Sequence, residues 1–70
     1  MKRVIDEGKT LLVDGPASVC LLTGKVNVLG APLKIEKNLV VRQGKRLPLW
    51  VNETATLELR LGEGASINEV

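Results

Sequence analysis

The chain has 70 residues, of which 44% are hydrophobic and 1% aromatic, and its ten Lys and Arg against eight Asp and Glu give a formal net charge of +2. A chain of this length forms one domain and buries only about 60% of the surface that its unfolded form exposes. No apolar run is long enough for a membrane span, and the charged start is unlike a signal peptide. We therefore expect a single cytoplasmic domain over residues 1–70, with no membrane contact.

The hydrophobic content is aliphatic, with twelve Leu, nine Val and three Ile, and Trp50 is the only aromatic residue. Branched side chains of this kind favour pleated, half-buried surfaces. Glycine-containing turns separate the apolar runs at strand-sized intervals, which leaves little room for long helices. In chain order, the predicted strands are Lys2–Asp6, Thr10–Val13, Ser18–Leu22, Lys25–Leu29, Leu33–Glu36, Leu39–Arg42, Leu47–Val51 and Ala55–Leu61, with a further extended piece around Ser66 and Ile67.

These elements predict an all-β fold, a small antiparallel β-sandwich or partly closed barrel of about seven or eight short strands. The Thr23-Gly24 and Asn52-Glu53 pairs are each typical of a tight reversal between two strands. Pro48 removes a backbone donor, so its strand is expected at an edge or beside a bulge. Several strands are apolar on both faces, which indicates either a position in the middle of the fold or a face that awaits a partner.

A catalytic or metal site is not expected in this chain. The sequence contains no His, and its carboxylates fall mostly at turns or on the wet faces of strands. The Gly8-Lys9-Thr10 triplet lacks the preceding Gly of a phosphate-binding loop and runs into an apolar strand instead of a helix. Cys20 lies in an apolar run, where a small buried side chain is the expected role. We predict no catalytic residue, no metal and no cofactor.

Two features remain as candidate contact sites. One is a set of cations around neighbouring turns, which we expect one end of the fold to present together, either as a solvated rim or as a contact for phosphate or RNA: Lys34, Lys37, Arg42, Lys45 and Arg46. The other is Trp50, which is out of phase with the alternating Leu47, Leu49 and Val51. Its ring is expected either on the outer face, as part of a docking surface, or in a core or edge-covering position.

The segments "GPASVCLLTGKVNVLGAPL", "KNLVVRQGKRLPLW" and "TATLELRLGEG" together resemble the N-terminal β-domain of the polynucleotide 5′-hydroxyl-kinase family, which includes Clp-type cleavage-factor subunits and their archaeal relatives. The resemblance covers about Thr10 to Leu61 and carries no catalytic residue. In that family the β-domain packs on a central P-loop kinase domain near the bound nucleotide. The resemblance therefore implies that Lys37 lies near nucleotide, and that the chain is either an excised domain or a stand-alone relative without the kinase. The absence of His and the single Gln are compatible with a thermophilic source, and the resemblance implies an archaeal-like one.

Three functions are consistent with this sequence. The first is a non-catalytic accessory or docking domain in RNA processing, whose partner is a P-loop kinase domain or another RNA-processing protein. The second is a small basic module that binds RNA weakly. The third is a self-associating structural domain, with a homodimer formed through exposed edge strands.

Overall fold

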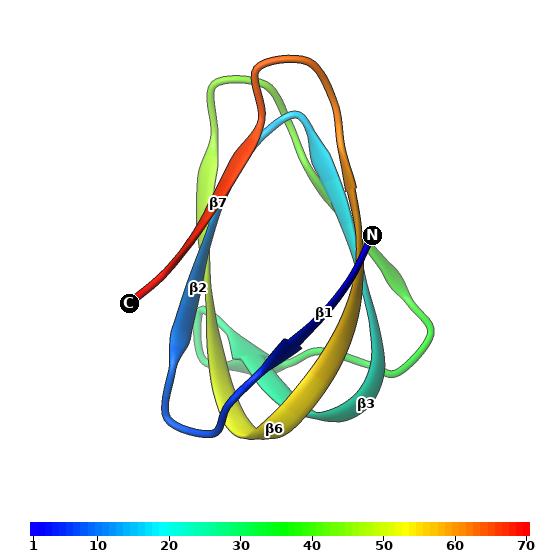
Figure 1. Ribbon diagram of the computed structural model, residues 1–70, viewed down its shortest axis with the longest axis vertical. Coiled ribbons are helices and arrows are strands. Elements are labelled where there is room, and N and C mark those ends of the chain that lie inside the picture. Colours follow the sequence, from blue (N-terminus) through cyan, green and yellow to red (C-terminus); the bar gives the residue numbers. More distant parts are fainter.

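The computed structural model describes residues 1–70 and is built from strands and turns, which confirms the predicted all-β fold (Figure 1). It has no helix that could cross a membrane. The seven strands are β1 (Lys2–Ile5), β2 (Thr10–Asp14), β3 (Ala17–Val28), β4 (Ala31–Pro32), β5 (Asn38–Val41), β6 (Arg46–Leu61) and β7 (Ser66–Glu69).

All seven strands belong to one antiparallel sheet that folds over on itself and does not close. The two long strands, β3 and β6, pair along most of their length and carry the fold from one layer to the other. The first layer has the order β5, first half of β3, second half of β6, β1. The second has the order β4, second half of β3, first half of β6, β2, β7. Figure 1 shows the two layers as the two sides of a wedge that bends at the middle of β3 and β6.

The bends in β3 and β6 correct two sequence predictions. Thr23-Gly24 does not reverse the chain, because β3 continues through it with register shifts against β6 between Leu21 and Val26. Asn52-Glu53 likewise lies inside β6. The predicted strand pairs on either side of these residues are therefore single bent strands. A bulge that adds twist lets one strand serve both layers, an alternative to a tight turn that the local residue types do not distinguish.

A third correction concerns the predicted strand Leu33–Glu36. Only Ala31–Pro32 forms a strand in this region, and Ile35 makes an isolated bridge to Leu21. Glu36 has a φ of 64°, which no regular strand permits. The alternating apolar pattern here therefore belongs to a loop that leads into β5. The other predicted strands are confirmed to within one residue at each shared end, except that β7 extends to Glu69.

The core lies between the two layers and consists of thirteen buried aliphatic residues, with no buried polar or charged residue among them. Its largest members are Ile5, Leu11, Leu21, Leu49, Leu57 and Leu59. These positions alternate with outward-facing residues along β2, β3 and β6, as strands with one buried face require. Each layer therefore presents a second face to the outside, and the candidate sites lie there or at the strand edges.

Candidate docking surfaces

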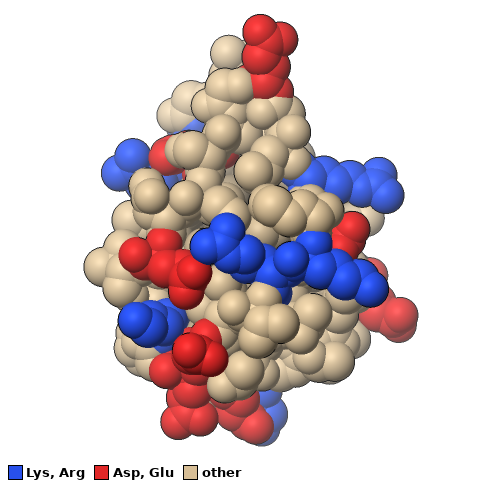
Figure 2. Space-filling view, in the orientation of Figure 1, with Lys and Arg blue, Asp and Glu red and all other residues tan.

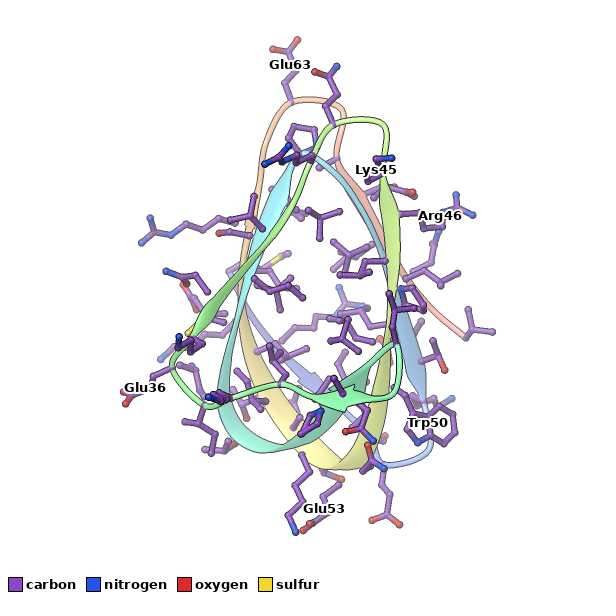
Figure 3. All side chains as sticks on the ribbon, turned by 180° about the vertical axis from the view of Figure 1, so that it is seen from behind. Glu36, Lys45, Arg46, Trp50, Glu53 and Glu63 are labelled. Carbon is purple, nitrogen blue, oxygen red and sulfur yellow. The ribbon has the colours of Figure 1, made fainter.

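Trp50 lies on the outer face of the second layer, one of the two positions that the sequence left open. Trp50 is 47% exposed, whereas the neighbouring Leu49 and Val51 are fully buried. Figure 3 shows the Trp50 ring outside the β6 ribbon, directed away from the core. In the sheet, Trp50 is paired with Thr10 of β2 on one side and with Asn27 of β3 on the other. An exposed indole flanked by short neutral side chains is accessible to a partner.

The strand register extends this surface over three cross-strand rows. The first row contains Trp50 with Thr10 on one side and Asn27 and Pro32 on the other. The second row contains Pro48, Leu12 and Asn68, and the third contains Arg46, Asp14 and Ser66. We call this surface the Trp50 face: Leu12, Asp14, Asn27, Pro32, Arg46, Pro48, Trp50, Ser66, Asn68 and Thr10. Its only charged groups are paired with each other. Low charge around an exposed aromatic residue is typical of the centre of a protein–protein interface.

The charged pair on this face is held by three hydrogen bonds. Arg46 donates to Asp14 from Nε to Oδ1 at 2.7 Å and from Nη2 to Oδ2 at 3.3 Å, and the Ser66 hydroxyl donates to Oδ2 at 3.1 Å. The hydrogen bonds from Arg46 lower the pKa of Asp14, burial opposes this, and Ser66 lowers it further. The same pair raises the pKa of Arg46. Arg46 therefore remains charged but is engaged within the domain.

The outer face of the first layer differs in charge. Its cross-strand partners include Lys2 and Glu58, and Ser18 and Arg60. A shallow pocket of about 230 Å³ on this face is lined by Ser18, Cys20, Leu22, Asn38, Glu58 and Arg60. Cys20 is half-buried on this outer side of β3, so the prediction of a buried cysteine is wrong. Its apolar neighbours in the sequence alternate between the two faces of the strand. No group of three or more metal-ligating side chains is brought together.

The five predicted cations do not gather at one end. Arg42, Lys45 and Arg46 line a groove of about 300 Å³, together with Val40, Val41 and Leu47. Lys34 and Lys37 lie before β5, in a turn where the Lys37 amide donates to the Lys34 carbonyl at 3.3 Å. Arg42 lies after β5, so the length of this strand separates the two groups. Figure 3 shows Lys45 at the upper right and Glu36, which lies between Lys34 and Lys37 in the sequence, at the lower left. The expectation of a single cationic end is therefore wrong.

The side of the molecule that carries β1 has charges of both signs. Figure 2 shows Lys and Arg interspersed with Asp and Glu on the side that carries β1. Arg3 of β1 and Glu69 of β7 form an ion pair there at 2.9 Å, which joins the outer strands of the two layers. A further exposed pair joins Lys25 and Glu53 at 3.1 Å. Exposed pairs of this kind contribute little to stability and leave no field of a single sign.

A scan of protein-family models and a search of curated proteins found no match. Among solved structures, the chain is similar to one chain of a structure that describes the extended interface between Pcf11p and Clp1p and the basis for ATP loss in a point mutant. The TM-score is 0.78 with 20% sequence identity over 97% of this chain, which spans 18% of the length of the matched chain. This likeness shows the fold: the chain has the architecture of a β-domain found in a Clp1p structure, as expected for the N-terminal domain of Clp-type polynucleotide kinases.

Proposed function

We propose that this chain is a non-catalytic docking domain of an RNA-processing assembly, and that it packs through the Trp50 face on a P-loop kinase domain. The observation that carries the proposal is the Trp50 face itself. It combines the only aromatic residue of the chain, 47% exposed, with half-buried Leu12 and Pro48 on a surface without an unpaired charge. Exposed aromatic residues in such a setting contribute a large share of the binding energy at protein interfaces.

The fold comparison supports the same proposal. The matched chain is more than five times as long as the aligned part, and that structure concerns an interface between two proteins and a loss of ATP. A β-domain that forms a small part of a longer chain has neighbouring domains to contact. We infer that this chain makes a comparable contact, either within a longer protein or with a separate subunit.

The chain's own ionisable residues support a non-catalytic role. Gly8 and Lys9 lie in the turn between β1 and β2, where both form backbone hydrogen bonds with Val51, and Thr10 is the first residue of β2. A phosphate-binding loop instead delivers its backbone amides to a ligand at the start of a helix. Asp14, Glu53, Glu58 and Glu69 each form an ion pair at the surface. Nucleotide chemistry, on this proposal, belongs to the partner.

The experiment that tests this function is a binding titration by calorimetry. The partner is a Clp-type P-loop kinase core that is produced without its own N-terminal β-domain, with and without ATP and Mg²⁺. We expect a 1:1 complex, and we expect Trp50→Ser to weaken it at least about tenfold, as for an aromatic hot spot. The matched control is Val4→Ser. Val4 is 62% exposed, but it lies on the outer face of the first layer with Lys2 and Glu58, away from the Trp50 face.

Two outcomes would contradict the proposal. One is the absence of heat and of co-elution in both nucleotide conditions. The other is an equal loss of affinity in Trp50→Ser and Val4→Ser, which would place the contact elsewhere on the domain.

A further inference from the structure

The net positive charge of the chain is concentrated in one segment. Residues 34–46 contain five of the ten Lys and Arg but only one of the eight Asp and Glu, so this segment has a formal charge of +4. The other residues, with five basic and seven acidic side chains, have a formal charge of −2. The segment consists of the loop before β5, β5 itself and the turn into β6, so the charge follows one edge of the sheet.

Most cations of this segment have no partner within the domain. Only Arg46 forms an ion pair, with Asp14. The remaining ion pairs of the structure involve the N-terminus, Arg3 and Lys25, all outside the segment. Lys34, Lys37, Arg42 and Lys45 are therefore unpaired and exposed. Unpaired charges of one sign raise the local potential and attract a partner of the opposite sign.

The same segment contains an unpaired strand edge. β5 pairs with β3 alone and is the last strand of the first layer, so one row of its backbone groups has no strand partner. Across the turn at Gln43 and Gly44, the start of β6 is also open on one side, since its pairing with β3 begins only at Leu49. The groove lined by Val40, Arg42, Lys45 and Leu47 lies along this seam, where the sheet does not close.

We propose that this basic edge, defined as β5 with the groove between β5 and the start of β6, binds an acidic peptide segment that adds to β5 as a further strand. The free backbone groups of β5 supply the hydrogen bonds of strand addition. Carboxylates on the added strand face Arg42 and Lys45 at one end and Lys34 and Lys37 at the other. Val40, which is 67% exposed, and Leu47 receive the aliphatic side chains of the peptide.

The character of the edge favours a peptide over RNA. Proteins that bind single-stranded nucleic acid combine a basic groove with aromatic side chains on which bases stack. No aromatic residue occurs in residues 34–46, and Trp50 lies on the outer face of the second layer. The exposed apolar residues of the segment are aliphatic, Ile35 at 54% and Val40 at 67%. A strand with aliphatic residues in its middle and acidic residues at both ends matches both the apolar character and the charge of this edge.

The inference is tested by NMR titration of the full chain with a synthetic peptide of about eight residues, a length typical of one strand, that has Glu at both ends and Val between them. We expect the largest amide shifts in β5 and in the turn into β6, and affinity that falls as salt is raised, because the cations are exposed. A version of the peptide with N-methylated amides along one edge cannot form the strand hydrogen bonds, so it is expected to lose binding.

Paired charge variants identify the surface. Arg42→Gln with Lys45→Gln is expected to weaken binding about tenfold. The matched control, Lys9→Gln with Lys25→Gln, removes the same charge elsewhere on the surface and is expected to change affinity less than about twofold. Thermal melts confirm that both variants fold. Equal effects of the two variant pairs, undiminished binding of the methylated peptide, or tighter binding of a single-stranded RNA of similar charge would each overturn the proposal.

This inference does not depend on the Trp50 face. Trp50→Ser is expected to leave peptide binding unchanged, and the Arg42 and Lys45 variants are expected to leave the kinase-core contact unchanged. Failure of one proposal is therefore distinguishable from failure of the other.

Discussion

Arg46 and Asp14 face each other across the β6–β2 pair, with Arg46 Nε 2.7 Å from Asp14 Oδ1. This contact determines which of the cations around the groove are free to bind a partner. Although Arg46 lines the groove with Arg42 and Lys45, its guanidinium is engaged with Asp14 on the Trp50 face. The pair thus stands where the two candidate surfaces meet, and it leaves Arg42 and Lys45 as the free cations of the groove.

The Asp14–Arg46 pair predicts a pH dependence of stability. Because the pKa of Asp14 is lowered in the folded protein from its ordinary value of 3.8, the ionised carboxyl stabilises the fold above that value. This stabilisation is lost as pH falls through the lowered pKa. Asp14→Asn is expected to reduce the free energy of unfolding at neutral pH, and the difference from the unmodified protein should shrink in acid. Urea unfolding at neutral pH and below pH 3.8 measures both. A difference that grows in acid would contradict the assignment.

Gly24, the one glycine of the bent strand β3, is predicted to be a position where any side chain destabilises the fold. Its φ is 93°, and a Cβ there would meet the Thr54 carbonyl oxygen and lie 2.6 Å from the Ala55 Cα. Since these are backbone atoms of β6, they cannot move aside without opening the bend. We expect Gly24→Ala to destabilise the domain by about 3 kcal/mol or more.

Gly64 provides the control for this substitution. Its φ is 86°, but a Cβ there would meet nothing within 4 Å. Gly64→Ala should therefore cost only the backbone strain, about 1 kcal/mol. Equal losses in the two variants, measured by chemical denaturation, would show that the close approach of β3 and β6 has no energetic role.

The core predicts a contrast between two leucines of β6. Leu57 is fully buried and paired with Leu21, whereas Leu61 is 39% exposed. Leu57→Ala is expected to cost about 2–5 kcal/mol, which approaches the total stability of a domain this small. Leu61→Ala should cost less than about 1 kcal/mol, because it leaves no enclosed cavity. Thermal unfolding followed by circular dichroism distinguishes the two, and similar melting temperatures would contradict the assigned core.

Local sequence signals predicted the elements where one strand has one buried face. The alternation of Leu57, Leu59 and Leu61 identified the end of β6, whereas the phase of Trp50 left its position open between the outer face and a core or edge-covering place, and the structure has it outside. The strand continuity through Gly24 was not predictable in this way. A glycine with positive φ serves equally in a hairpin turn and in a bulge, and only the pairing of β3 with β6 over both layers decides between them.

The candidate surfaces depended even more on long-range arrangement. The sequence identified the five cations, but their division between the two ends of β5 follows from the strand's length and direction. The register that joins Trp50, Pro48 and Leu12 into one surface brings together residues of β6 and β2 that are far apart in the chain. The ion pair between Asp14 and Arg46 had no local signal, because residues that pair across strands carry no mark of their register when they lie 32 positions apart.

The most direct test of the docking role is the fluorescence of Trp50, which reports from the proposed interface without a label because it is the only Trp and the chain has no Tyr. The kinase core used as partner should have its own Trp residues replaced, so that the emission comes from this domain alone. The account predicts a shift of the emission to shorter wavelength that saturates at one kinase core per domain, because the half-exposed ring loses its water contact on docking. An unchanged emission spectrum in a complex that demonstrably forms would contradict the Trp50 face as the docking surface.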